Sequence, residues 1–427
     1  MTISETRVEA DLAEVLDEAA LRRRLDTAFA GVARKRVVVA VSDAGRRSYA
    51  AIGGGGDAAD EADEAERQAV PTGCVTKLFV AALIADEISS GTFGSDDEAA
   101  RLLDMSRGSV LTGVTIRHLL EHTHGLDDSA ITAAPATADG SIDAAALLAR
   151  LDGHRLAEPG AYYSYSNVGA WLLAAVLERV HGRPFESLLH ERVLEALRFR
   201  DLRSVPCSGP GNRICAATGG ALALSVRDLL TFLEARAAVW RTESVTPLPG
   251  WSVLEKGVCL GWKYHGEGWF GHQSIASRVS LMARIEPRRR IALVVASERH
   301  PAPVVAAKLF ARLLPELGRL ELPKRLPPWQ AAALDLHAYR GRYGCAAERW
   351  TVSIEDDAPS LRLSTASFTT PLEPAEGELF FTRIAGPGRL AFVQFVERAA
   401  SSFRYLWDGR RLLRRWEAPA RPAADRP

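Results

Sequence analysis

Apolar residues at three- and four-residue spacing mark a helix that begins just after Pro71. The apolar positions of this stretch are Val75, Leu78, Phe79, Ala82 and Leu83. Such spacing is typical of an amphipathic helix with one buried face. The same period predicts helices over residues 8–29, 114–126, 168–180 and 304–317, and one more after Ser225.

Runs of β-branched residues and short alternating segments predict strands in two parts of the chain. Residues 36–42 suit a buried strand, and 270–274, 278–285 and 291–297 are expected to be neighbouring strands. A tight turn at 286–290 joins the last two, which is typical of an antiparallel hairpin. Beyond residue 328, short alternating segments separated by Gly and Pro predict a small β-barrel or sandwich.

Segments without an apolar period divide the chain into domains. Four glycines at 53–56 and the acidic stretch 57–66 are expected to form a loop, and 321–328 is a Pro-rich linker. We therefore predict an N-terminal helix packed on the body (1–30), a catalytic body (31–320), the linker, and a β domain (329–427). A chain of 427 residues is long enough for this organisation.

Charge and cysteine content exclude several classes of function. Lys plus Arg and Asp plus Glu both number 53, so we expect no nucleic-acid partner and no membrane partner. The N-terminus lacks a basic start followed by an apolar run, and no apolar segment approaches the about 20 residues that span a bilayer. Five scattered cysteines without a C-x-x-C pair argue against a disulfide scaffold or a zinc site, and favour a reducing cytoplasm.

No metal or other cofactor is expected. His122 and His124 have a spacing that could suit a metal pair, but no third cluster of ligands accompanies them in the sequence.

Cys74 and Lys77 form a candidate nucleophilic site at the start of the helix after Pro71. Residues three apart in a helix share a face, so the Lys77 ammonium should lie near the Cys74 thiol. The ammonium and the positive end of the helix dipole both favour the thiolate, which is the nucleophilic form. The alternative is a packing role, because a lone Cys before an apolar helix is commonly a core residue.

The order of motifs resembles the serine β-lactamase and penicillin-binding-protein superfamily, specifically its class C β-lactamase-like esterase and transacylase branch. Its Ser-x-x-Lys motif corresponds to Cys74-Val75-Thr76-Lys77, with Cys in place of Ser. Its Tyr-x-Asn motif is matched by Tyr165-Ser166-Asn167, and its third motif, Lys-Thr-Gly or His-x-Gly, by His272-Gln273-Ser274. Residues 115–126, 219–222 and 259–262 are also similar to stretches of this family, and the tail around 336–343 resembles a lipocalin-like domain.

The resemblance implies an α/β (α+β) body in which helices flank a mostly antiparallel sheet beside an all-helical subdomain, followed by a small C-terminal β-barrel-like domain. The site should lie between the sheet and the helices. By resemblance, Tyr165 moves protons, Asn167 holds Lys77 and the substrate, and His272 orients a substrate carbonyl or carboxylate. The backbone N–H groups of Cys74 and of the strand after His272, with Ile275 as the candidate, would form the oxyanion hole.

Two departures from the family pattern shape the functional hypothesis. Ser274 stands where the family has Gly, which is expected to narrow or reshape the site. The third-motif Lys, a partner for the carboxylate of β-lactams, is absent, which argues against hydrolysis of β-lactam antibiotics. Cys74 would form a thioester, and thioesters react with amines, relative to water, more readily than oxygen esters do.

We therefore predict an ATP-independent acyltransferase of natural-product biosynthesis that forms amide or ester bonds through acyl-Cys74. Its partners would be a small-molecule acyl donor (ester, thioester or amide) and an amine or alcohol acceptor. Two alternatives remain open: a thiol-dependent esterase or amidase of the same fold, and a binding protein that has lost catalysis. A serine replaced by cysteine in order to trap an acyl-enzyme would give the same sequence. The other four cysteines are expected to be packing residues.

Overall fold

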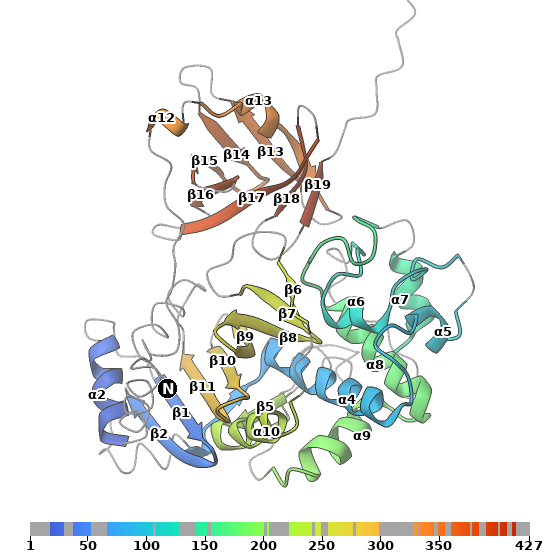
Figure 1. The fold of residues 1–427 in the computed structure, drawn as a ribbon, viewed down its shortest axis with the longest axis vertical. Helices are drawn as coiled ribbons and strands as arrows, with labels where there is room; N and C mark the ends of the chain where they lie inside the picture. Colours follow the sequence, from blue (N-terminus) through green and yellow to red (C-terminus); the bar gives the residue numbers. More distant parts are fainter. Residues whose placement is uncertain are drawn as a thin grey trace, which may run out of the picture.

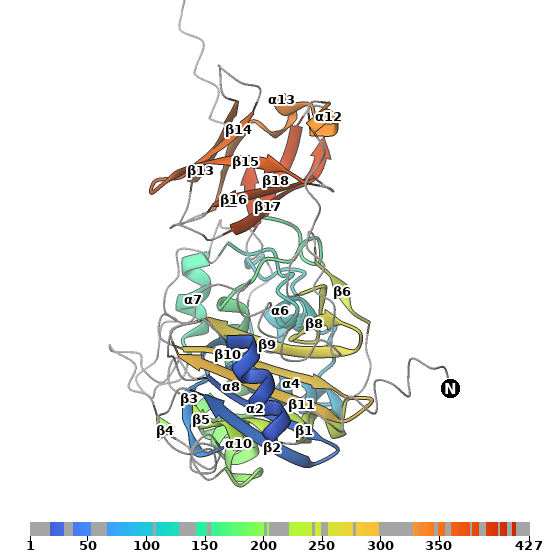
Figure 2. The same ribbon diagram turned by 90° about the vertical axis from the view of Figure 1, so that its left-hand side faces the viewer.

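The computed structural model shows a body of sheet and helices with a barrel above it (Figures 1 and 2). It describes residues 18–29, 37–52, 66–105, 108–127, 142–151, 155–199, 203–204, 222–240, 244–248, 255–275, 279–298, 328–331, 333–345, 349–354, 360–375, 378–383, 390–399, 402–407 and 412–415. The predicted loop at 53–65, the helix at 304–317, the linker up to residue 327, Cys207 and Cys215 lie outside these residues.

A mostly buried antiparallel sheet forms the centre of the body. Its eight strands within the described residues lie in the order β2-β1-β11-β10-β9-β8-β7-β6. The strands are β1 (Val37–Asp43), β2 (Arg46–Ile52), β6 (Thr246–Pro247), β7 (Gly257–Cys259), β8 (Trp262–Gly266), β9 (Trp269–Ile275), β10 (Val279–Glu286) and β11 (Ile291–Glu298). The predicted hairpin is confirmed, because Glu286 pairs with Ile291 across the turn.

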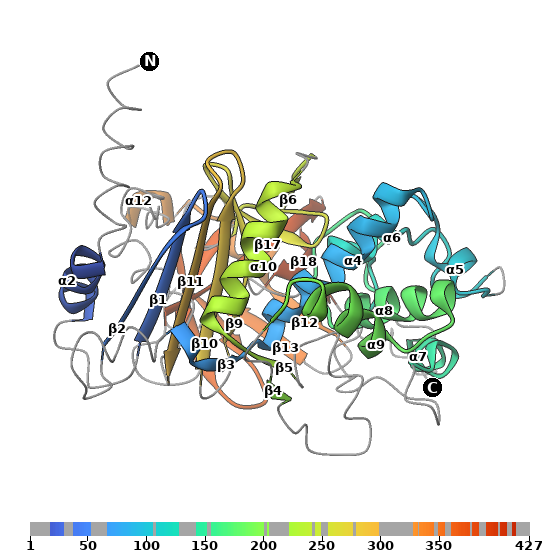
Figure 3. The ribbon, with the colours of Figure 1, turned by 90° about the horizontal axis from the view of Figure 1, so that it is seen from below.

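Helices cover the two faces of this sheet. Helix α10 (Val226–Ala238) begins after Ser225 as predicted and packs against β1, β10 and β11. Ser225 caps this helix, because its hydroxyl oxygen accepts the backbone N–H of Asp228 (3.0 Å). Helix α2 (Glu18–Phe29) packs against β2. Figure 3 shows α2 and α10 on opposite sides of the sheet.

An all-helical subdomain lies on the α10 side, beyond helix α4 (Figures 1 and 3). The helix predicted after Pro71 begins as a 3₁₀ turn, η1 (Gly73–Thr76), and continues as α4 (Lys77–Ser90). The other helices are α5 (Ala99–Leu102), α6 (Ile116–Leu120), α7 (Ala144–Leu151), α8 (Val168–His181) and α9 (Phe185–Leu189), which runs into a π turn, η2 (His190–Glu195). None of the described helices combines the length and the apolar character needed to cross a bilayer.

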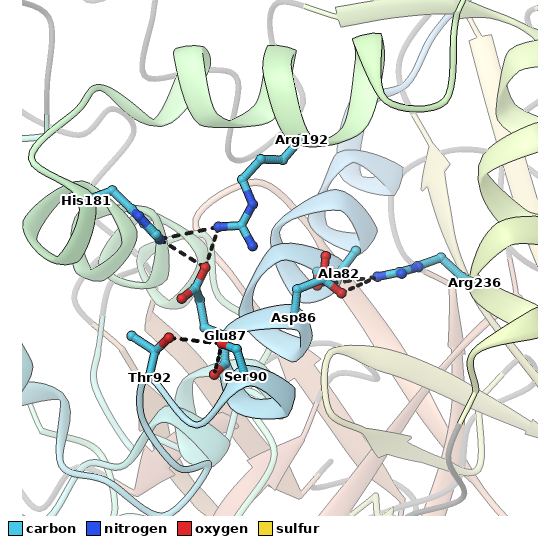
Figure 4. Close-up of polar contacts among 8 residues, drawn as sticks. All are labelled: Ala82, Asp86, Glu87, Ser90, Thr92, His181, Arg192 and Arg236. Atoms are coloured by element: carbon cyan, nitrogen blue, oxygen red, sulfur yellow. Dashed lines mark hydrogen bonds and ion pairs between the residues drawn. The ribbon is translucent and has the colours of Figure 1, made fainter.

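Helix α4 is fixed on both sides by buried or half-buried ion pairs (Figure 4). Asp86 pairs with Arg236 of α10 (Oδ1 to Nη1, 3.1 Å). On the next residue, the carboxylate of Glu87 accepts hydrogen bonds from Arg192 of η2 and, at 2.9 Å, contacts Nε2 of His181 of α8. These contacts set the position of α4 between the sheet layer and the helical subdomain.

The C-terminal strands close into a barrel, which confirms the predicted fold class. Strands β12 to β19 follow one another around it, and β19 pairs back with β12. They are β12 (Gly341–Gly344), β13 (Arg349–Ile354), β14 (Leu361–Ser364), β15 (Thr369–Pro374), β16 (Leu379–Arg383), β17 (Leu390–Ala399), β18 (Ser402–Trp407) and β19 (Leu412–Arg415), with the short helices α12 (Pro328–Ala331) and α13 (Leu336–Tyr339) before them. Aromatic side chains, among them Tyr339, Phe380, Phe395 and Phe403, fill the interior.

Tyr405 of β18 contacts the body, and Leu156 of the body belongs to the hydrophobic cluster of the barrel. The Tyr405 hydroxyl donates to the backbone carbonyl of Leu156 (3.3 Å), and its ring packs against that of Tyr162 (centroids 5.1 Å apart). Both partners belong to the segment that leads into α8. The predicted domain boundaries themselves stay predictions, since the linker lies outside the described residues.

The Glu87 cluster gives a prediction for stability. Glu87 is 3% exposed; its burial acts to raise the pKa of the carboxyl group, but hydrogen bonds from Arg192, Thr92 and His181 outweigh burial and lower the pKa. Glu87→Gln should lower the free energy of unfolding at neutral pH by about 1.5–3 kcal/mol, because it removes charged hydrogen bonds. Chemical denaturation measures this difference.

The pH dependence and a matched control test the same cluster. A lowered pKa means that the stabilisation is present above the unfolded value of about 4.3 and is lost as pH falls through the folded value, so the gap between Glu87→Gln and wild type should close below about pH 4. Asp104→Asn is the control, because its ion pair with Arg179 is exposed (81% and 59%) and should change stability by less than about 0.5 kcal/mol. Equal losses in the two variants, or a gap independent of pH, would contradict this account.

Candidate active site

A small second sheet positions the turn that carries Cys74. Strand β5 (Leu222–Ser225) pairs with β3 (Ala69–Pro71) and β4 (Arg203–Ser204). Directly after β3, both the backbone N–H and the hydroxyl of Thr72 donate to the Leu222 carbonyl (2.9 Å each). The hydroxyls of Thr72 and Thr76 are 2.7 Å apart, and since Thr72 uses its proton on Leu222, Thr76 is the donor. The turn is thus held at both ends.

Gly73 is required by its conformation and by its neighbour. Its φ of +49° lies in the left-handed region, which L-residues with a side chain rarely adopt. A Cβ on Gly73 would meet the Ser274 hydroxyl oxygen at 2.0 Å. Ser274, which is buried, therefore occupies the space beside the residue that precedes the candidate nucleophile.

The first two sequence motifs meet at the N-terminus of α4. Cys74 is partly exposed and packs against an apolar cluster that includes Tyr165. Lys77 is buried, and its Nζ donates to Oδ1 of Asn167 (2.8 Å) and lies 4.9 Å from the centroid of the Tyr165 ring. The fold therefore brings a thiol, an ammonium, a phenol and a carboxamide into one place.

Lys263 of β8 is a site residue that the sequence reasoning missed. Its Nζ is also 4.9 Å from the Tyr165 ring centroid, so two ammonium groups flank one phenol. Lys263 is 8% exposed and pairs with Glu255 (2.5 Å). Its place between Trp262 and Tyr264 in a buried strand could have identified Lys263 from the sequence, because buried lysines occur mainly where they are paired or functional.

A polar network continues from Lys263 to the far side of β9. Glu255 accepts hydrogen bonds from Lys263 and from Nε2 of Gln273, and Oε1 of Gln273 accepts from Arg284 (3.0 Å). Arg284 also donates to the His272 carbonyl (3.1 Å). Burial lowers the pKa of Arg284 to about 9, with Glu255 acting in the opposite direction, so the guanidinium is charged at neutral pH. Gln273 therefore serves this network with its side chain.

His272 is neutral in this site. It is 1% exposed, and its ring centroid lies 5.9 Å from that of Tyr165. Burial, and then the charges of Lys263 and Lys77, lower the pKa of His272 well below its usual value. The imidazole consequently carries no charge near pH 7.

His122 and His124 both accept hydrogen bonds from backbone N–H groups. Nδ1 of His122 accepts from the Ser166 N–H (3.2 Å), and Nδ1 of His124 accepts from the Leu126 N–H (3.1 Å). The His122 carbonyl accepts from the Ser164 N–H (2.8 Å). Among the described residues there is no group of three or more His, Cys, Asp or Glu side chains arranged for a metal. These histidines fix the segment that presents Tyr165.

One further part of the predicted site is described only through its backbone. Ile275 is the last residue of β9 and pairs with Ser280 of β10. The oxyanion hole formed with the Cys74 N–H stays a prediction, and residues 219–221 lie outside the described part of the chain.

Sequence comparison identifies the family. The Beta-lactamase family model matches residues 19–315, and the chain therefore belongs to that family, within the serine β-lactamase and penicillin-binding-protein superfamily. Penicillin-binding protein 4 of Amycolatopsis lactamdurans is 23% identical over 64% of this chain and 83% of its own length. A probable fimbrial assembly protein, FimD, of Dichelobacter nodosus is 31% identical over 27% of this chain, and the match spans only 30% of its length.

Solved structures show the same fold. A crystal structure of SurE with D-Leu has a TM-score of 0.71 and 24% identity, and the match covers 93% of this chain and 99% of SurE. A D-stereospecific amidohydrolase from Streptomyces sp. has a TM-score of 0.53 and 20% identity, over 69% of this chain and 98% of its own. The match to SurE thus extends beyond the body into the C-terminal part of the chain.

The contact between Gly73 and Ser274 gives a prediction of coupling. Gly73→Ala should destabilise the protein by about 1–3 kcal/mol and slow alkylation of Cys74, because the new methyl group clashes with the Ser274 hydroxyl at positive φ. In a Ser274→Gly background the clash is gone and only the conformational cost remains. A double-mutant cycle from thermal unfolding should therefore show coupling of at least about 1 kcal/mol.

Gly91 provides the control for this cycle. It caps α4 at φ +77°, and a Cβ there would meet nothing within 4 Å. Gly91→Ala should carry the conformational cost alone and show no coupling to Ser274→Gly. If the changes in unfolding free energy caused by Gly73→Ala and Ser274→Gly are additive, the close approach of the two residues does not restrict which side chain position 73 tolerates.

Proposed function

We propose that this member of the Beta-lactamase family is an ATP-independent acyltransferase that forms an amide or ester bond through a thioester on Cys74. The observation that carries the proposal is the position of Lys77. One turn after a partly exposed cysteine, its buried ammonium contacts both the Asn167 carboxamide and the face of the Tyr165 ring. A cation in this place stabilises a thiolate, which is a ready nucleophile without the strong base that an alcohol requires.

The reaction follows in two balanced steps. The Cys74 thiolate attacks the acyl carbon of the donor, the bond to the leaving group breaks, and the leaving group takes a proton from the Tyr165 phenol. An amine (or alcohol) then attacks the thioester carbon and loses a proton to the Tyr165 oxygen, while the C–S bond breaks and returns the thiolate. Lys77 and Lys263, on the ring of Tyr165, stabilise the phenolate form between the two steps.

The surroundings of Cys74 favour transfer to an amine over hydrolysis. Cys74 packs against an apolar cluster that includes Tyr163, Tyr165, Val258 and, from the barrel, Tyr405. Such surroundings restrict water near the thioester. Thioesters also favour amines over water as attacking groups. Hydrolysis, the usual reaction of this family, is the outcome that opposes the proposal.

The names of two structural relatives suggest the stereochemistry of the donor. One structure contains D-Leu and another is a D-stereospecific amidohydrolase. We therefore propose a donor whose acyl residue is D-configured, and a biosynthetic pathway for small peptides or related natural products. A reducing compartment such as the cytoplasm would keep the Cys74 thiol available.

The first experiment follows the acyl group by intact-mass spectrometry. D- and L-aminoacyl thioesters of N-acetylcysteamine serve as donors and an amino-acid amide as the acceptor. The D donor should give an adduct on Cys74 that disappears when the amine is added, with release of the amide product. Cys74→Ala should reduce turnover at least about 10³-fold, because it removes the nucleophile.

Matched variants separate the alternatives. Cys345→Ala changes a buried cysteine of the barrel and should leave the adduct unchanged. Cys74→Ser should still form an acyl-enzyme but pass a smaller share of it to the amine. If water captures the acyl group at every amine concentration, the protein is a hydrolase. If no adduct forms on Cys74 with any donor, covalent catalysis is wrong and the binding-protein alternative stands.

Lys263 provides a second prediction for the same reaction. Lys263→Met should lower kcat/KM for acylation by about 10–100-fold, because one of two cations beside Tyr165 is lost. Lys263→Arg should keep most of the activity. Stopped-flow kinetics with a p-nitrophenyl ester measures kcat/KM for both variants.

Two further variants control for damage to the ion pair. Lys256→Met removes an exposed lysine on the same hairpin and should have no effect. The double variant Lys263→Met, Glu255→Gln removes both buried charges. Its free energy of unfolding should therefore be like that of the wild type, while its kcat/KM for acylation should stay low. A fully active double variant would show that Lys263 acts only by neutralising Glu255.

A further inference from the structure

The imidazole of His272 is held in one tautomer. Its Nδ1 lies 2.9 Å from the backbone carbonyl oxygen of Gln273. A carbonyl oxygen only accepts hydrogen bonds, so Nδ1 carries the ring proton and donates it. In a neutral imidazole the other nitrogen, Nε2, is then a hydrogen-bond acceptor.

Nε2 of His272 lacks a hydrogen-bond partner among the described residues, although the side chain is 1% exposed. A buried polar atom normally has a hydrogen-bond partner. Where it has none, a bound ligand is expected to supply that partner. Protonation does not resolve the mismatch, because burial and the charges of Lys263 and Lys77 lower the pKa of this histidine. The neutral Nε2 of His272 therefore requires a hydrogen-bond donor from a ligand.

The fold places the His272 ring near the turn that carries Cys74 and near the Tyr165 phenol. Side chains two residues apart on a strand project from the same face, so His272 and Ser274 share a face of β9. Ser274 is the residue that would touch a Cβ on Gly73, directly before Cys74. The Tyr165 ring lies 5.9 Å from the His272 ring, centroid to centroid. His272 thus stands close to both the nucleophile turn and the phenol.

The chemistry of Nε2 selects the ligand group. Carbonyl and carboxylate oxygens are acceptors, so the expectation that His272 orients one of these does not fit the neutral tautomer. A protonated ammonium is disfavoured beside two lysines. A neutral primary amine suits the site, because it brings N–H donors and keeps its lone pair for attack.

We infer that Nε2 of His272 accepts a hydrogen bond from one N–H of the acceptor amine and so directs the nitrogen lone pair at the thioester carbon of acyl-Cys74. This inference rests on the acyl transfer proposed above. In the step, the new C–N bond forms, the C–S bond breaks to return the thiolate, and the second N–H proton passes to the Tyr165 oxygen. The first N–H becomes that of the amide product.

Single-turnover kinetics tests this role by separating acylation from capture. Acyl-Cys74 is formed with the D-aminoacyl N-acetylcysteamine thioester and then mixed with a primary amine. His272→Leu should slow capture by the amine about 10–100-fold, which is the range for losing one buried hydrogen bond, and change acylation less than about threefold. His272→Gln, which offers an oxygen near the position of Nε2, should restore capture at least about fivefold over His272→Leu.

A second measurement uses the unaltered protein. A primary amine has one N–H for His272 and one to lose, whereas its N-methyl derivative has a single N–H for both purposes. The wild type should therefore discriminate against the N-methyl amine by a larger factor than His272→Leu does. Equal discrimination by both proteins would overturn the inference, because steric effects of the methyl group are shared.

Failure of this inference is distinct from failure of the proposed reaction. If the wild type forms no acyl-Cys74, or passes it only to water, acyl transfer itself is wrong, whatever the variants do. If the wild type captures the amine and His272→Leu captures it equally fast, only the role of His272 is wrong. A loss of acylation as large as the loss of capture would place His272 in the first step and overturn its assignment to the acceptor.

Discussion

The buried ammonium of Lys77 is the constraint on which the rest of the site depends. A lysine that is 5% exposed is stable only if its charge is paired or hydrogen-bonded, and Asn167 supplies an oxygen at 2.8 Å. Lys77 opens α4 and Asn167 is the N-cap residue of α8, so one hydrogen bond joins the two helix starts that carry Cys74 and Tyr165. The ion pairs of Asp86 and Glu87 fix the far end of α4, which leaves little freedom for its first turn.

Positive charge concentrates around this bond. Lys77, Lys263 and Arg284 are all buried, and the described residues around them contribute the carboxylate of Glu255. Low dielectric surroundings make such an excess costly unless anions form nearby. A thiolate at Cys74 and a phenolate at Tyr165 are the anions that the proposed reaction generates, and a neutral His272 adds no further positive charge. The charges around Lys77 and the proposed chemistry are therefore consistent with each other.

Local patterns predicted much of this arrangement, and long-range contacts account for what they missed. The apolar period located α4 and α8, and the alternating segments located β9, β10 and β11, because both signals depend on near neighbours in the chain. The motifs selected Cys74, Lys77, Tyr165 and Asn167, which the fold brings together. Lys263, Glu255 and Arg284 come together only through the register of neighbouring strands, which no single segment encodes. The close approach of Gly73 and Ser274, some 200 residues apart, was hidden for the same reason.

The barrel reaches the site through the segment that Lys77 and His122 hold in place. In the segment 156–167, the Leu156 carbonyl accepts the Tyr405 hydroxyl and the Tyr162 ring packs against the Tyr405 ring. The same segment also carries Tyr165 and Asn167, and Asn167 accepts from Lys77. Tyr405 also belongs to the apolar cluster against which Cys74 packs. Limited access of water to an acyl-enzyme suppresses hydrolysis, which competes with capture by an amine. A barrel residue is therefore part of the apolar surroundings of Cys74, which the proposed transfer to an amine requires.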